Sequence, residues 1–139
     1  MATSGKNLSE YNKDLIPNAA EMRFGIVVSE WNDEITNGLL DGALSTLKDN
    51  GCPEDQIHTH YVPGAFELPL GAQFILESVN VDAVICIGCV IQGETKHFDF
   101  VCHGATQGVM DVGLKFGKPA IFCVLTDNTK EQSLDRSGG

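Results

Sequence analysis

The sequence has few basic residues and no long apolar run. Lysine and arginine number 9 against 19 aspartate and glutamate, which gives a formal net charge of −10. This excludes nucleic-acid binding, because phosphate backbones require clustered lysine and arginine. No run is long enough for a membrane span, and the N-terminus lacks the apolar stretch of a signal peptide. We therefore expect a cytoplasmic protein with neither nucleic acid nor membrane as a partner.

Arginine is also scarce, and the cysteines do not form a pairing pattern. Arg23 and Arg136 are the only arginines, so few side chains could bind a phosphate or carboxylate in a bidentate manner. The five cysteines are an odd number in apolar runs, which is typical of reduced, buried thiols. Cys86 and Cys89 have the spacing of a redox or metal motif. However, a three-residue offset in a strand points them to opposite faces, so we interpret them as core residues.

The composition, 42% hydrophobic and 20% charged, indicates a single globular domain over residues 1–139. Residues 1–20 lack periodicity and are expected to form an arm. Apolar runs and helical spacing then alternate, which predicts a parallel sheet with helices on both faces. The predicted strands are 23–29, 56–63, 81–91 and 119–126, and the predicted helices are 32–51, 64–80, 97–117 and 128–139.

Ligands of parallel sheets bind outside the carboxyl ends of the strands, which makes the loops after the four strands candidate site segments. Trp31, the only tryptophan, follows the first strand. It serves either as a core or interface anchor or as a platform on which a planar ring stacks. Glu67 lies at a helix start, where it either caps the helix or contacts a ligand.

His97 opens the third predicted helix, after the strand expected at the centre of the sheet. The helix dipole disfavours a cation there, so the neutral imidazole, a competent base, is favoured. His97 could be a solvated surface residue or a proton-transfer group, and its position after the central strand favours proton transfer. The N–H groups of Gly93–Thr95 could receive a phosphate, although the Glu94 carboxylate would repel one unless it turned to solvent.

Two further patterns carry weaker hypotheses. His58 and His60 share one face of the second strand, but without a third ligand they are more typical of solvated edge residues than of a metal site. Gly104, Ala105 and Gly108 on the third helix would let another helix approach closely, although glycine lowers helix stability.

Three motifs occur in order: VPGAFELP, GCVIQGETKHFDFV and AIFCVLTDNTKEQSLDRSGG. Together they resemble the lumazine synthase family of riboflavin biosynthesis over nearly all of residues 23–139. The resemblance implies a flavodoxin-like three-layer αβα sandwich with a four-stranded parallel sheet. It also implies a homopentamer, which in many members builds an icosahedral shell, with active sites between subunits.

The resemblance implies a transferase that condenses 5-amino-6-(D-ribitylamino)uracil with 3,4-dihydroxy-2-butanone 4-phosphate. The products would be 6,7-dimethyl-8-ribityllumazine, phosphate and water, in the penultimate step of riboflavin biosynthesis. The 5-amino group attacks the ketone to give a Schiff base, phosphate leaves, the ring closes and water is lost. These steps need orientation, proton transfer and an anion site, but no metal or redox cofactor.

The resemblance also implies a role for individual residues. Trp31 would stack on the pyrimidine, and His97 would transfer protons. The uracil would be held at its ribityl chain and ring by Ala65, Phe66 and Glu67, by the backbone of Cys89, Val90 and Ile91, and by Phe122 of a neighbouring subunit. The butanone phosphate would bind at Glu94 through its backbone N–H, at Thr95, and at Arg136, which clamps the phosphate.

Family members continue beyond the motif that ends at Gly139, with a lysine near the phosphate, an acid near the histidine and a last helix. None of these falls within residues 1–139, so we expect the fourth strand to lack part of its cover. Two other interpretations stay open. One is a flavodoxin-like module that binds a flavin or lumazine without turnover, which would not need His97 and Arg136 together. The other is a shell or interaction protein, which only the glycines of the third helix favour.

Overall fold

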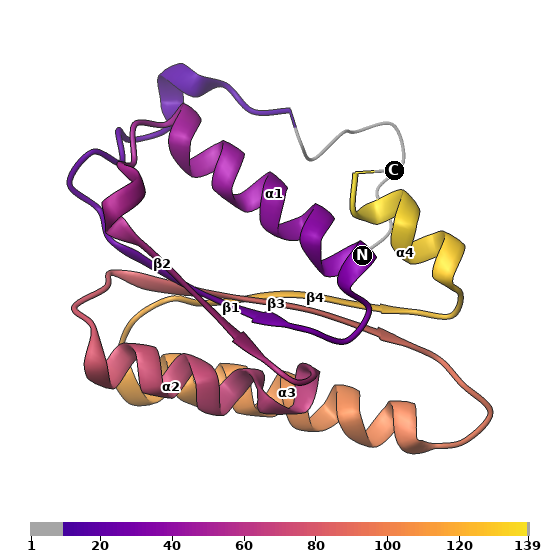
Figure 1. The fold of residues 1–139 in the computed structure, drawn as a ribbon. Coiled ribbons are helices and arrows are strands. Elements are labelled where there is room, and N and C mark those ends of the chain that lie inside the picture. The colour runs from indigo at the N-terminus through magenta and orange to yellow at the C-terminus, as the bar shows by residue number, and fades with distance from the viewer. Residues whose placement is uncertain (1–9, 139) are drawn as a thin grey trace.

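The computed structural model describes residues 10–138, so the first half of the expected arm lies outside the described residues. Four parallel strands lie between two layers of helices (Figure 1). The strands and helices follow the predicted alternation closely. Their bounds are β1 Phe24–Ser29, α1 Asp33–Asp49, β2 Ile57–Val62, α2 Leu68–Ser78, β3 Ala83–Ile91, α3 His97–Phe116, β4 Ala120–Asp127 and α4 Lys130–Arg136.

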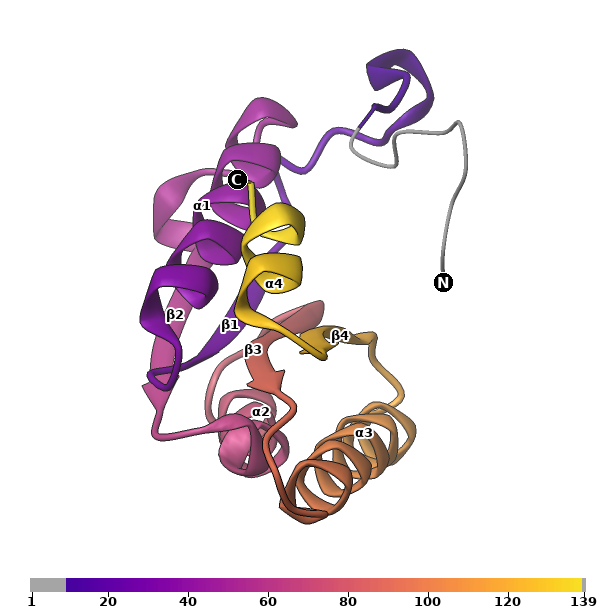
Figure 2. The same ribbon diagram turned by 90° about the vertical axis from the view of Figure 1, so that its right-hand side faces the viewer.

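The strand order is β2-β1-β3-β4, with every pairing parallel. Helices α1 and α4 cover one face of the sheet, and α2 and α3 cover the other (Figure 2). This order is that of the flavodoxin-like folds, so the predicted fold class is confirmed. The order reverses direction between β1 and β3, and a ligand site is expected beside that switch point.

The two central strands carry the core. Val27 and Val84 pack against α2 and α3 in one cluster of buried side chains. Ile26 and Ile87 face the other way and pack against α1. All four are fully buried, which explains why β1 and β3 are apolar on both faces. The rigid centre of the sheet therefore fixes the loops that follow these two strands.

The outer strand β4 is less covered than its apolar sequence alone would suggest. Ile121 is 48% exposed and Phe122 is 38% exposed. The expectation that this strand lacks part of its cover is therefore confirmed. The expectation that all five cysteines are buried was wrong for two of them, because Cys102 on α3 and Cys123 on β4 are only partly buried.

Helix α2 begins later than predicted. Residues Ala65–Glu67 form a separate 3₁₀ turn before α2 starts at Leu68. The close approach expected at the glycines of α3 is confirmed. A Cβ on Gly108 would lie 2.5 Å from Cγ of Pro69, and one on Gly104 would lie 2.7 Å from the Phe66 ring. The glycines thus let α3 pack directly on the start of α2 and on the turn before it.

Candidate functional site

A cavity of about 470 Å³ opens beside the carboxyl ends of β1 and β3, a size suited to a small organic ligand. Its walls come from the loop after β1, the turn before α2, the end of β3 and the first turns of α3. Nine of the predicted site residues lie there, a set that omits Glu94, Phe122 and Arg136. The lining consists of Trp31, Asn32, Gly64, Ala65, Phe66, Glu67, Cys89, Val90, Ile91, Gly93, Thr95, His97, Phe98 and Val101.

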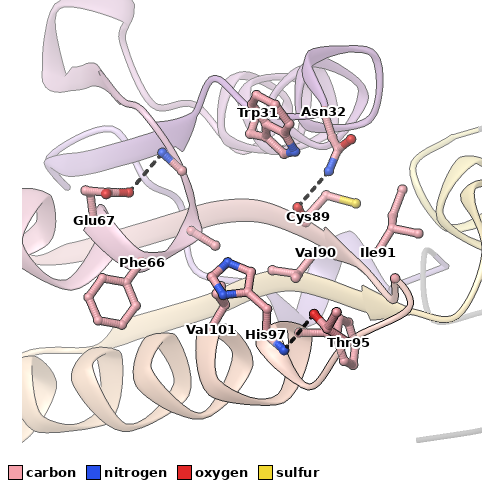
Figure 3. Close-up of a pocket in the computed structure, with 14 residues that line it drawn as sticks. Trp31, Asn32, Phe66, Glu67, Cys89, Val90, Ile91, Thr95, His97 and Val101 are labelled. Atoms are coloured by element: carbon pink, nitrogen blue, oxygen red, sulfur yellow. Dashed lines mark hydrogen bonds between the residues drawn. The ribbon is translucent and has the colours of Figure 1, made fainter.

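Trp31 and His97 enter the cavity from opposite sides (Figure 3). Trp31 projects from the loop between β1 and α1 and is 73% exposed, so it is not a core anchor of this chain. His97 is the first residue of α3, and its ring points into the cavity. A planar ligand lying on the indole face would therefore be close to an imidazole that can exchange protons.

Asn32 is a site residue that our sequence reasoning missed. Its backbone has a left-handed φ of 61°, the only positive φ of a non-glycine residue in the described chain. Its side-chain amide donates a 3.0 Å hydrogen bond to the carbonyl of Cys89 (Figure 3). A signal was available, because asparagine tolerates this conformation better than most residues. The bond ties the loop after β1 to β3 at the floor of the cavity.

Strand β3 presents an unpaired backbone edge to the cavity. Its pairing with β1 ends at Ile87, whereas its pairing with β4 continues to Ile91. The N–H of Gln92 bonds to β4, and strand alternation therefore turns the polar groups of Val90 toward β4 as well. The N–H and C=O of Cys89 and Ile91 face the opposite way, toward the cavity, and the C=O of Cys89 is occupied there by the Asn32 amide. They supply hydrogen-bonding groups at a fixed spacing.

The turn before α2 forms a second wall. The carboxylate of Glu67 accepts a 3.1 Å hydrogen bond from the N–H of Gly64, which closes the turn. The capping interpretation of Glu67 therefore holds, while the same residue also lines the cavity. Ala65 and Phe66 belong to the same wall, where Ala65 is buried and Phe66 is exposed.

The loop before α3 leaves backbone donors open. Within residues 10–138, the N–H groups from Gly93 to Lys96 have no hydrogen-bond partner. The hydroxyl of Thr95 accepts a 3.3 Å bond from the N–H of His97 (Figure 3). Glu94 is exposed and outside the lining, which keeps its carboxylate in solvent. Open N–H groups at a helix start favour an anion.

Arg136 and Phe122 do not line this cavity. Arg136, at the end of α4, lies with its Nε 3.7 Å from Oδ1 of Asp127. Asp127 in turn pairs with Ile91 at the end of β3. The arginine is therefore near the loop before α3 without reaching into the cavity. Phe122 lies on β4 and is 38% exposed.

The thiols of Cys86 and Cys89 are not suited to nucleophilic chemistry. Burial raises the pKa of Cys86 to about 12. Burial also raises the pKa of Cys89, with the Asp127 charge adding to the rise and a hydrogen bond to Ser133 opposing it. Both thiols are protonated near neutral pH, and the thiolate is the nucleophile. The interpretation of this pair as core residues rather than a redox motif is consistent with these shifts.

Residues 10–138 contain no cluster of three or more histidine, cysteine or acidic side chains arranged to bind a metal ion. His58 instead lies 3.4 Å from an Nη of Arg23, and His60 is exposed on the edge strand. No helix within the same residues is long and apolar enough to span a bilayer. The lining thus offers an aromatic face, backbone donors and acceptors, and one imidazole.

Comparison with known proteins gives a consistent result. The profile of a protein family described as 6,7-dimethyl-8-ribityllumazine synthase matches residues 21–139. A protein of that name from Flavobacterium johnsoniae is 63% identical over 139 residues, covering 100% of this chain and 73% of its own. Proteins of the same name from Flavobacterium psychrophilum and Christiangramia forsetii are each 56% identical, covering 100% of this chain and 74% and 83% of their own.

Proposed function

This chain belongs to the 6,7-dimethyl-8-ribityllumazine synthase family, and on that premise we propose how its cavity holds the two substrates. The protein is a transferase that condenses 5-amino-6-(D-ribitylamino)uracil with 3,4-dihydroxy-2-butanone 4-phosphate. The observation that carries the assignment is the opposition of Trp31 and His97 across the cavity. A mere binder of flat rings would not need the imidazole.

The pyrimidine ring stacks on Trp31 in this proposal. Its polar edge meets the N–H of Cys89 and the backbone groups of Ile91. The backbone of Val90 is turned toward β4, so Val90 contacts the ring through its side chain and not, as the resemblance implied, through its backbone. This division follows from the strand alternation at the end of β3. The ribityl chain extends along the turn that contains Ala65, Phe66 and Glu67.

His97 transfers protons in this proposal. Attack of the 5-amino nitrogen on the ketone forms a C–N bond, and the nitrogen must lose protons as water leaves to give the Schiff base. The carbon next to the imine then loses its proton as phosphate departs, which leaves an enol that becomes a ketone. The second nitrogen attacks this ketone and closes the ring with loss of another water. Each step moves a proton to or from a nitrogen, an oxygen or a carbon, and a positioned imidazole accelerates such transfers.

The phosphate of the second substrate binds at the loop before α3. The N–H groups of Glu94 and Thr95, which have no partner among the described residues, supply neutral donors, and the Thr95 hydroxyl lies beside them. Arg136 supplies the charge. Its side chain contacts Asp127. Asp127 pairs with Ile91, the last residue of β3, and so lies next to this loop, which places Arg136 within reach of the phosphate.

We infer that the active protein is a homopentamer in which a neighbouring subunit completes each active site. The inference holds whether or not the pentamers assemble further into a shell. Large apolar side chains are exposed on several elements, among them Phe74 on α2, Leu114 on α3 and Phe122 on β4. A surface on which such side chains gather marks a protein–protein contact. Phe122 of the adjacent copy would then close the cavity. The native mass of the assembly tests this inference.

The condensation itself is tested by mixing both substrates with the protein and following the lumazine product by its absorbance or fluorescence. We expect product to form faster than in the same mixture without protein, and to depend on both substrates. If the protein binds the uracil but the rate equals that of the protein-free mixture, the protein is instead a non-catalytic binding module.

A further inference from the structure

Arg136 is connected to the wall of the cavity by a series of polar contacts that meet at Asp127. The Cys89 thiol donates to the hydroxyl of Ser133 over 3.5 Å. That hydroxyl donates to Oδ2 of Asp127 over 2.8 Å, and the other carboxylate oxygen lies 3.7 Å from Nε of Arg136. Ser133 both accepts and donates, whereas the Asp127 carboxylate only accepts, so the contacts from Ser133 and from Arg136 converge on its two oxygens.

The middle of this series is buried and fixed. Ser133 is 0% exposed, and Cys89 is 2% exposed. The Asp127 side chain is 13% exposed, whereas that of Arg136 is 55% exposed. The backbone of Asp127 is also held, because its carbonyl accepts a 3.0 Å bond from the N–H of Gln92. A fixed carboxylate thus holds one edge of a solvent-facing guanidinium.

The guanidinium keeps donors available. Nη1 of Arg136 bonds to the carbonyl of Gln132 over 2.9 Å, and Nε faces Asp127. Within residues 10–138, Nη2 has no partner. An arginine anchored through part of its planar fork loses less freedom when the rest binds an anion.

We propose that Asp127, oriented by Ser133, is a positioning residue that holds Arg136 ready for the phosphate of the second substrate. This rests on the proposed phosphate role of Arg136. Asp127 does not touch the substrate in this account. It lowers the entropic cost of ordering Arg136, and that benefit exceeds the repulsion between its own charge and the phosphate.

The test uses Asp127→Asn, which keeps the size and the acceptor for Ser133 but removes the charge. We expect the KM for the butanone phosphate and the inhibition constant of inorganic phosphate each to rise roughly three- to tenfold. The KM for the uracil should stay unchanged. Asp135→Asn is the matched control, since it removes the same charge from an exposed residue next to Arg136 and should leave all three values in place.

Combining Asp127→Asn with Arg136→Ala separates the phosphate role of Arg136 from the positioning role of Asp127. If Asp127 acts through Arg136, Asp127→Asn should add less than about twofold in that background. If Arg136→Ala alone leaves the KM for the butanone phosphate unchanged, the phosphate role of Arg136 is wrong. If Arg136→Ala raises that KM but Asp127→Asn lowers it or leaves it unchanged, only the role of Asp127 is overturned.

Ser133→Ala tests the same positioning role if Asp127→Asn fails to fold. It leaves the Asp127 charge in place and removes only the buried hydroxyl that orients it. We expect a smaller rise, about two- to threefold, in the same two phosphate-dependent constants. Equal changes in the constants for both substrates would indicate a structural role for the series and contradict the proposal.

Discussion

The side-chain amide of Asn32 donates a 3.0 Å hydrogen bond to the backbone carbonyl of Cys89, across the floor of the cavity. Asn32 holds a left-handed backbone while it does so, with φ at 61°. The loop that carries Trp31 is therefore fixed to β3 by a residue whose own conformation is unfavourable for most side chains. Local strain persists only where surrounding contacts hold it, and it concentrates at functional sites.

Two substitutions of Asn32 separate its backbone role from its side-chain role. Asn32→Ala loses both the hydrogen bond and the tolerance of positive φ, so we expect the free energy of unfolding to fall by about 1–2 kcal/mol. Asn32→Gly loses only the bond and should cost less. Both should raise the KM for the uracil. Denaturant titration gives the stabilities, and equal losses for the two variants would contradict the role assigned to the backbone.

Replacing His97 with alanine should slow turnover by about 10²–10⁴-fold, the usual contribution of a positioned acid–base group. Uracil binding should change little, because the ring stacks on Trp31. His103→Ala is the matched control, since His103 lies exposed on the same helix and outside the cavity. Steady-state kinetics of both variants decide the matter, and an unchanged rate in His97→Ala would remove the histidine from the mechanism.

Arg136→Lys should raise the KM for the butanone phosphate about tenfold, which corresponds to the loss of one charge-assisted hydrogen bond. Lysine keeps the charge but not the planar fork, and the KM for the uracil should not follow. Arg23→Lys provides the control, because Arg23 lies just before β1, at the opposite end of the sheet from the cavity. Parallel rises in both KM values would make Arg136 a structural residue.

Gly108→Ala should destabilise the fold by about 1–3 kcal/mol, because the new Cβ would collide with the ring of Pro69. Gly42→Ala is its counterpart on α1, where a Cβ meets nothing within 4 Å. That change should stabilise by roughly 0.5–1 kcal/mol through helix propensity. Thermal unfolding of the two variants measures the contrast, and shifts of the same sign would refute the close packing of α2 and α3.

The sequence predicted those strands, helices and loops that follow from local residue preferences or from the spacing of apolar residues. Strands β1 and β3 are apolar on both faces and lie at the centre, and the loops after them form the cavity that holds Trp31 and His97. Exposure depends on neighbours, so Ile121 and Cys123 on the outer strand could not be assigned from pattern alone. The contact of Arg136 with Asp127 joins groups from different elements and was invisible for the same reason.

The start of α2 illustrates a finer limit. A continuous helical pattern from Gly64 concealed a separate 3₁₀ turn, because Glu67 folds back onto the Gly64 N–H and closes the turn first. Asn32 carried a usable signal that we did not apply. Its tolerance of positive φ, directly after a buried strand and a lone tryptophan, was enough to mark it as a site residue.

Trp31 reports on the central claim, that a planar ring binds against its face. It is the only tryptophan and is 73% exposed, so it dominates the fluorescence and is open to ligand. Stacking on an aromatic side chain contributes on the order of 1–3 kcal/mol per base in nucleic-acid sites. Trp31→Ala should therefore weaken uracil binding by about ten- to a hundredfold, and Trp31→Phe should retain most of the affinity with little change in melting temperature.

The most direct measurement is a titration of the wild-type protein with 5-amino-6-(D-ribitylamino)uracil while Trp31 fluorescence is followed. Free tryptophan at the same ligand concentrations corrects for absorption by the ligand. We predict saturable quenching beyond that control, with a midpoint that matches the dissociation constant from calorimetry. Binding by calorimetry without any change in Trp31 fluorescence would place the ring elsewhere and contradict the account.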